Sequence, residues 1–237
     1  MIDRSYLKEL AASFGVSLND EALERFDLYA QLLCDWNEKI NLTAITNPDE
    51  ICVKHFADSL TVLGNTEIPQ NAALIDVGTG AGFPGLALKI ARPDLQVTLL
   101  DSTKKKLMVL EDISRNLKLD VELLHMRAEE AGQDKAYREQ FDLATARAVA
   151  NLATLSEYCL PFVKPGGRFL AMKSAKTQEE LTDAKRAIQV LGGCVGEIHT
   201  LMLATAGERT IIEVKKQSPT PALYPRPSAK IARFPLK

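Results

Sequence analysis

A short segment of the chain carries glycine at every second position, at Gly78, Gly80 and Gly82. It follows an apolar stretch that ends near Asp76, and after Phe83 it reaches a Pro-Gly pair that suits the opening of a helix. Glycines at such a turn allow positive φ and let a ligand approach the backbone without meeting a Cβ. The pattern predicts a strand, a tight turn and a helix N-terminus that cradle a nucleotide-like cofactor.

Acidic residues follow the first three predicted strands. Asp76 stands at the end of the first strand, where a carboxylate suits a cationic amino group better than a pyrophosphate. Asp101, after the second strand, can accept hydrogen bonds from both ribose hydroxyls, and Glu129, after the third, can accept one from an adenine amino group. Open α/β sheets bind ligands at the carboxyl ends of their strands. These acids therefore predict a negative pocket for S-adenosylmethionine, which carries an ammonium and a sulfonium and no phosphate.

Other interpretations of the same residues stay open. Residues 80–85 fit the dinucleotide pattern G-x-G-x-x-G literally, so a nicotinamide dehydrogenase is an alternative. Asp101 could merely cap the helix that starts near Thr103, and Glu129 with Glu130 could be solvated surface charge. The coincidence of these acids with the glycine loop, each after its own strand, favours the cofactor pocket.

Strands and helices that would position these residues alternate from residue 72 onward. Strands are predicted over 73–77, 96–100, 121–124, 141–145 and 168–172, and helices over 85–91, 104–117, 151–160 and 177–191. Such alternation indicates a mostly parallel, doubly wound α/β sheet. Strand-like segments 195–203 and 209–215 lie too close for a crossover helix, so they predict an antiparallel C-terminal hairpin. The expected fold is a Rossmann-like sheet of seven strands.

The chain divides into three expected parts. Apolar residues at helical spacing predict an N-terminal helical extension over residues 1–68, with Asn19 in a cap and a further helix over 48–63. The Rossmann-like domain is expected over 69–217, and a basic, proline-containing tail over 218–237. Every charged residue after Glu213 is basic. The tail is therefore expected to be either a solubilising end or a strap that contacts phosphate.

Composition narrows the class of protein. Net charge is −2 and 46% of the 237 residues are hydrophobic, which is ordinary for a globular protein. No run could span a membrane and the N-terminus lacks the layout of a signal peptide, so a cytoplasmic location is expected. Four cysteines without a CxxC pair and three scattered histidines predict no metal site.

Four motifs, taken together, resemble a known family. In order they are residues 36–45 (WNEKINLTAI), 55–60 (HFADSL), the glycine loop 76–85 and 147–150 (RAVA). They resemble the bacterial glucose-inhibited division protein B (RsmG) family, small-subunit ribosomal RNA guanine-N7 methyltransferases, and the resemblance extends to the tail. It implies a Rossmann-like methyltransferase that uses S-adenosylmethionine.

The resemblance also implies roles for particular residues. One departure from the family pattern is the pair Lys173-Ser174, where Lys-Gly is expected, and it questions the backbone geometry after the fifth strand. The cofactor residues that the resemblance implies are Gly78 and Phe83 in the loop, Asp101 on the ribose side, Ala128 and Glu129 beside the adenine, and Arg147 after the fourth strand.

Guanine N7 carries an available lone pair at neutral pH, so its methylation needs placement rather than a general base. N7 and O6 are acceptors, for which arginine and lysine are the natural donors. The candidates that would position the guanine are Arg147, Lys173 and Arg209. Polar residues expected at the rim of the active site are Asn41, His55, Asp58 and Ser59.

Each candidate has a plain structural alternative. His55 and Asp58 could form a helix-surface pair, and Arg147 could pair with Asp142 or Asp76 inside the sheet end. Lys173 and Arg209 could simply be solvent-exposed. Of the aromatic residues, Trp36 is expected to pack in a core, whereas Phe83 is expected on an exposed turn with a functional role.

The leading hypothesis is methylation of guanine N7 in small-subunit (16S) ribosomal RNA, presented as RNA, as a 30S subunit or as an assembly intermediate. A methyltransferase for another RNA, a protein or a small molecule is an alternative. So are a ribosome-binding factor without catalysis and the dehydrogenase. A monomer is expected.

Overall fold

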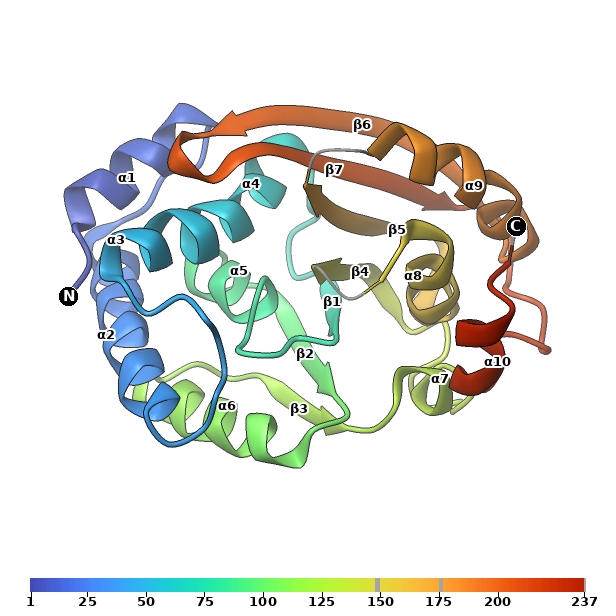
Figure 1. The fold of residues 1–237 in the computed structure, drawn as a ribbon, viewed down its shortest axis with the longest axis horizontal. Coiled ribbons are helices and arrows are strands. Elements are labelled where there is room, and N and C mark those ends of the chain that lie inside the picture. The colour runs from blue at the N-terminus through green and yellow to red at the C-terminus, as the bar shows by residue number, and fades with distance from the viewer. Residues whose placement is uncertain (148–149, 175–176, 237) are drawn as a thin grey trace.

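The computed structural model describes residues 1–147, 150–174 and 177–236. In this part of the chain seven strands form one sheet in the order β3-β2-β1-β4-β5-β7-β6, with helices on both faces (Figure 1). The first five strands are parallel, and β7 lies antiparallel between β5 and β6. The strands are β1 (Ala73–Val77), β2 (Gln96–Asp101), β3 (Glu122–His125), β4 (Phe141–Arg147), β5 (Val163–Ser174), β6 (Gly193–Leu203) and β7 (Gly207–Lys216).

The predicted Rossmann-like sheet and its C-terminal hairpin are confirmed. The bounds of β1 and of helix α5 (Gly85–Ala91) coincide with those predicted. Strand β5 begins before residue 168, and a register shift between β4 and β5 accommodates its extra residues. The other predicted helices are α6 (Lys104–Asn116), α8 (Leu152–Cys159) and α9 (Thr177–Val190), each within two residues of its predicted bounds.

The N-terminal helices share one apolar core with a face of the sheet. Phe26 and Phe56 of these helices belong to the same buried cluster as Leu86 of α5 and Leu99 of β2. Helices α8 and α9 cover the opposite face in a second cluster. The N-terminal helices are α1 (Arg4–Ser13), α2 (Asp20–Asn37), α3 (Pro48–Ile51), the π-helix η1 (Cys52–Ala57) and α4 (Asp58–Asn65).

The helix predicted over 48–63 is confirmed, but its middle is the π-helix η1. Because hydrophobic periodicity records only that a segment is helical, it does not distinguish five-residue from four-residue hydrogen bonding. A π-helical turn often marks a functional site. Here it includes His55, and Asp58 follows it directly.

Short elements complete the fold. They are α7 (Ala128–Ala131), the 3-10 turns η2 (Leu160–Phe162) and η3 (Ala204–Ala206), and α10 (Ser228–Arg233). No helix in the described ranges has both the length and the apolar character needed to cross a membrane.

Residues 218–236 fold back onto the domain, so the expectation of a solubilising end is wrong. Arg138 donates 2.7 Å and 2.6 Å hydrogen bonds to the carbonyls of Tyr224 and Thr220. Two of the basic residues after Glu213, Lys216 at the end of β7 and Arg226 in the tail, are buried in ion pairs with Glu139 and Glu157. These two side chains are therefore unavailable to phosphate, a result that depends on distant acids and not on the tail's own composition.

Candidate active site

The glycine loop joins β1 to α5 through backbone conformations that favour glycine. Gly78, Gly80 and Gly82 have φ of 75°, 60° and 97°. Oδ2 of Asp76 accepts hydrogen bonds from the Thr79 hydroxyl at 2.6 Å and from the backbone N–H of Gly85 at 2.8 Å. One carboxylate oxygen therefore fixes both ends of the loop.

Asp76 itself is completely buried beneath this loop. Burial raises the pKa of its carboxyl group to about 6, partly offset by the hydrogen bonds from Thr79 and Gly85. Its second oxygen, Oδ1, has no hydrogen-bond partner among the described residues. Such an orphaned buried acceptor is uncommon and is suited to a donor from outside the chain.

A cavity of about 510 Å³ lies at the carboxyl ends of β1, β2 and β3; we call it the glycine-loop cavity. Asp101 lines it and is tied down from both sides, since Oδ2 accepts from the N–H of Gly80 at 3.0 Å and Oδ1 from that of Thr103 at 2.8 Å. Asp101 therefore orients the start of α6 and also faces the cavity. The predicted cofactor residues that line the cavity are Gly78, Asp101, Ala128 and Glu129.

Sequence reasoning missed two walls of this cavity. Thr154 and Tyr158 of α8, and Ser228 and Ala232 of α10, also line it. Each pair is spaced by four residues and so shares one helix face. That spacing is the local signal that the sequence offered, but it does not reveal which cavity the face adjoins.

Phe83 contradicts the expectation of an exposed turn, because it is only 5% exposed. Its ring stacks against Tyr29 at 5.2 Å and against His55 at 4.5 Å between centroids. Helix α2 and η1 cover the turn, which no local pattern at Phe83 reveals. Gly80, Gly82 and Phe83 shape the loop and are not part of the cavity lining.

A second cavity, of about 530 Å³, is lined by all three predicted guanine-positioning residues; we call it the arginine cavity. Ala150 lines both cavities, so the two adjoin after the end of β4. The predicted residues that line the arginine cavity are His55, Asp58, Arg147, Lys173 and Arg209, together with Lys54 and Glu180, which the sequence did not suggest.

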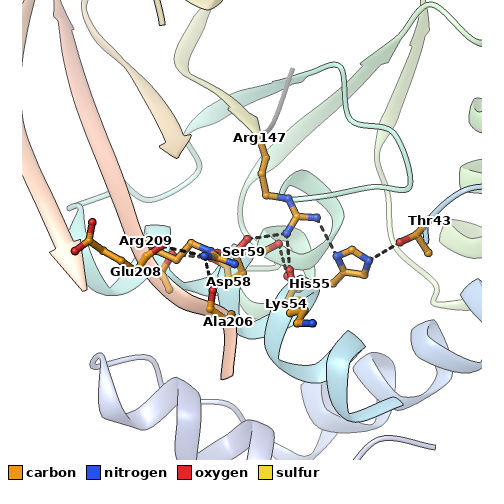
Figure 2. A network of polar contacts seen from close by, with 10 residues as sticks. Thr43, Lys54, His55, Asp58, Ser59, Arg147, Ala206, Glu208 and Arg209 are labelled. Carbon is orange, nitrogen blue, oxygen red and sulfur yellow. Dashed lines mark hydrogen bonds and ion pairs between the residues drawn. The ribbon is translucent and has the colours of Figure 1, made fainter. Parts of the chain in front are cut away.

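Asp58 holds two arginines from different strands (Figure 2). Its Oδ2 accepts from Nη1 of Arg147 at 2.9 Å, and its Oδ1 accepts from Nε of Arg209 at 2.7 Å. Asp58 is 4% exposed. The suggested partners of Arg147, Asp142 and Asp76, are thus wrong, and Arg209 is not a simple surface residue.

His55 is fixed between Arg147 and Thr43 (Figure 2). Nη2 of Arg147 lies 3.2 Å from Nδ1, and Nε2 lies 2.9 Å from the Thr43 hydroxyl. Because a guanidinium can only donate, Nδ1 must accept and Nε2 must carry the proton. Burial, and then the charge of Arg147, lower the pKa of His55 to about 3. His55 is therefore neutral and is not the partner of Asp58.

Lys173 is also held in place at the arginine cavity. Its Nζ lies 2.8 Å from Oε2 of Glu180 and donates to the carbonyl of Ala150 at 2.6 Å. Ser174 continues β5 in register with Arg209, so the departure from Lys-Gly leaves the strand regular at that position. Residues 148 and 149 of the RAVA motif lie outside the described residues.

Two expected rim residues do not line the cavity. Ser59 is completely buried, and its hydroxyl donates to the carbonyl of His55 one turn earlier. Asn41 is exposed in the loop after α2 rather than in a helix. Trp36 packs against the core as expected, and its indole N–H donates to Asp112 at 2.8 Å.

Solved structures share this fold. The precorrin-6Y C5,15-methyltransferase of Geobacter metallireducens matches 67% of this chain and 87% of its own, with a TM-score of 0.51 at 14% identity. The YcgJ protein of Bacillus subtilis matches 69% of this chain and 100% of its own, with a TM-score of 0.52 at 12% identity. At such identities the likeness shows the fold alone.

Sequence relatives cover nearly the whole chain. Ribosomal RNA small subunit methyltransferase G of Acetivibrio thermocellus is 47% identical over 98% of this chain and 96% of its own length. The proteins of the same name from Brevibacillus brevis and Lactococcus lactis are 45% and 46% identical, over 96% and 94% of this chain and 97% and 95% of their own lengths. The profile of the GidB family, described as rRNA small subunit methyltransferase G, matches residues 22–212. The chain therefore belongs to the GidB family of small-subunit ribosomal RNA methyltransferases.

Proposed function

We propose that this chain transfers the methyl group of S-adenosylmethionine to N7 of a guanine in small-subunit (16S) ribosomal RNA. The observation that carries the proposal is the pair of adjoining cavities that meet at Ala150. One is lined by the acids Asp101 and Glu129 after the sheet strands, and the other presents arginine and lysine side chains.

The residues of the glycine-loop cavity fit S-adenosylmethionine. Asp101 retains acceptor capacity for the ribose hydroxyls, and Ala128 and Glu129 are suited to lie beside the adenine. Oδ1 of Asp76 lies beneath the loop and outside the cavity lining; it has no partner among the described residues and could accept from an ammonium donor that reached it. When bound, the cofactor supplies an electrophilic methyl group.

The loop's own hydrogen bonds argue against the dinucleotide alternative. A pyrophosphate would need free backbone N–H groups at the glycine turn. The N–H of Gly80 is already donated to Asp101, that of Gly85 to Asp76, and those of Gly82 and Phe83 to the carbonyl of Thr79. These amides already donate hydrogen bonds within the loop or to its acids, so they are not free to bind a pyrophosphate.

Three cations can position the acceptor base. Arg209 uses Nε on Asp58 and Nη1 on the carbonyls of Ala206 and Glu208, which leaves Nη2 as a donor toward O6 or a phosphate. Arg147 and Lys173 line the same cavity. Positioning by these donors would present N7 to the methyl group.

No side chain of this network has to remove a proton. His55 is neutral, and both of its ring nitrogens are occupied by Arg147 and Thr43. The N7 lone pair attacks directly, so in-line placement supplies the catalysis.

The three parts of the chain have distinct roles in this proposal. Residues 1–68 contribute His55 and Asp58 to the arginine cavity, and 69–217 form the sheet and most of both cavities. From the tail, Ser228 and Ala232 complete the cofactor side. Both cavities are built from one chain, and we expect it to act as a monomer. Because the proposed substrate is small-subunit ribosomal RNA, we expect the enzyme in the cytoplasm.

The test is transfer of labelled methyl groups to small-subunit RNA that lacks this modification. Naked RNA, assembly intermediates and 30S subunits are compared, and N7-methylguanosine is mapped by chain cleavage at the modified base. Incorporation at one guanine is expected. Cofactor binding without transfer to any form would favour the non-catalytic factor and overturn the proposal.

A further inference from the structure

The short helix α10 forms part of the wall of the glycine-loop cavity. Ser228 and Ala232, four residues apart, face the cavity, while Ile231 is completely buried against the domain. Figure 1 shows α10, at the red end of the chain, beside α7 and α8. The buried Ile231 fixes which face of α10 is turned toward the cavity.

An ion pair anchors the segment just before α10. Arg226 makes three hydrogen bonds to the carboxylate of Glu157, from Nε at 2.7 Å, from Nη2 at 2.6 Å and from its backbone N–H at 3.0 Å. Glu157 is completely buried on α8, the helix that contributes Tyr158 to the cavity. A bidentate pair of this kind sets orientation as well as position.

A second anchor lies directly after α7, the helix whose first residues are Ala128 and Glu129. The ring of Pro225 is so close to Gly132 that a Cβ there would lie 2.9 Å from Cγ of the proline. Nε2 of Gln133 donates to the Pro225 carbonyl at 3.0 Å. The tail therefore packs against α8 and against the turn after α7, next to the residues proposed to hold the adenine.

We propose that α10 is a built component of the cofactor site, and that Ser228 and Ala232 contact the adenosine of S-adenosylmethionine. This inference rests on the function proposed above. The wall adjoins Ala128 and Glu129 rather than the arginine cavity, so it acts on affinity for the cofactor and not on placement of the guanine.

Two alanines of α10 offer a matched test. Both alanines are exposed, but Ala232 lines the cavity and Ala229 does not. Ala232→Leu therefore adds bulk at the cavity wall, whereas Ala229→Leu adds the same bulk to the same helix outside the lining. Titration calorimetry with S-adenosylmethionine and S-adenosylhomocysteine is expected to give at least tenfold weaker binding for Ala232→Leu. Ala229→Leu is expected to bind within twofold of the unchanged protein and to retain its kcat.

Gly132→Ala tests the packing of Pro225 against the turn after α7, at a position that does not line the cavity. The φ of Gly132 is −69°, which alanine adopts freely, so the added Cβ acts through Pro225. Cofactor affinity is expected to fall severalfold, and the effect is expected to vanish in a chain truncated after Pro227, which already lacks α10.

The outcomes separate this inference from the proposed function. If the unchanged protein does not bind S-adenosylmethionine, the proposed function fails. If it binds, but Ala232→Leu and the truncated chain bind equally well, α10 is not part of the site and only this inference is overturned.

Discussion

Nε of Arg209 donates a 2.7 Å hydrogen bond to Oδ1 of Asp58, although 151 residues separate the two in the sequence. The other oxygen of the same carboxylate accepts from Arg147. A single buried anion at the start of α4 thus positions cations from β4 and β7. The N-terminal helices in this way form part of the arginine cavity and do not only cover the sheet.

Asp58→Asn should weaken methylation more than cofactor binding. The amide keeps the shape of the carboxylate but removes the charge that both arginines share. Misplaced donors at a reacting base can lower kcat/KM for the RNA on the order of a hundredfold. Two partly buried cations left without a counter-charge should lower the free energy of unfolding by about 3 kcal/mol. Methyl-transfer kinetics and urea melts measure the two effects.

A matched control for this variant is Asp120→Asn, at an exposed carboxylate before β3. It should leave both kcat/KM and the melting curve unchanged. Unaltered RNA methylation by Asp58→Asn would show that the arginines do not depend on this anchor.

His55 should stay neutral in the folded protein well below pH 6. Its folded pKa of about 3 lies below the ordinary 6.5, so only the unfolded chain gains this proton as pH falls. The stability that His55 contributes is therefore present above pH 6.5 and is lost progressively toward pH 3, at about 1.4 kcal/mol per pH unit. Nitrogen chemical shifts should also report a proton on Nε2.

Comparison with His55→Gln isolates this effect, because the variant lacks the titrating ring. Its urea-melt stability should fall less steeply between pH 6.5 and 4 than that of the unchanged protein. Parallel stability curves for His55→Gln and the unchanged protein would contradict the assignment.

Tyr29→Phe should loosen the glycine loop from a distance. The buried hydroxyl of Tyr29, on α2, donates a 2.5 Å hydrogen bond to the carbonyl of Ala81. Its removal leaves that acceptor without its partner, at a cost of about 1–2 kcal/mol of unfolding free energy. Cofactor affinity should fall severalfold in calorimetry, and Tyr6→Phe on α1 should serve as a neutral control. A stability loss with unchanged affinity would show that the loop holds its shape without Tyr29.

The elements that the sequence predicted well are those with local signals. An apolar run followed by alternating glycines and a Pro-Gly pair defines β1, the turn and α5 within a dozen residues, and the structure keeps the bounds of both elements. The short link between 203 and 209 likewise excludes a crossover helix, so the antiparallel hairpin followed from chain length alone.

Contacts between distant segments were not predictable in the same way. Phe83 is buried because α2 and η1 cover its turn, and the tail is seated because Glu157 on α8 is available to Arg226. A single sequence does not show which acidic side chain pairs with which basic side chain. It therefore named Arg147, Arg209 and Asp58 as candidates without joining them.

Asp76→Asn should separate stability from cofactor binding. The folded pKa of Asp76, about 6, lies above the ordinary 3.8, so its charged form is disfavoured by burial. The stability linked to its proton is present below pH 3.8 and is lost as pH rises through 6. Between pH 3.8 and 6 the free energy of unfolding of the Asp76→Asn protein should therefore rise by up to about 3 kcal/mol relative to that of the unchanged protein.

Asp76→Asn should weaken the binding of S-adenosylmethionine, although it should increase stability. The amide oxygen can still accept from Thr79 and Gly85, but its NH₂ group would replace Oδ1, the acceptor that we propose for the cofactor's ammonium. Because donor would then face donor, S-adenosylmethionine should bind at least tenfold more weakly in calorimetry at pH 7.5. A variant that bound the cofactor normally would show that Asp76 serves only to brace the loop. One whose relative stability did not vary between pH 4 and 7 would show that burial leaves its carboxyl unshifted.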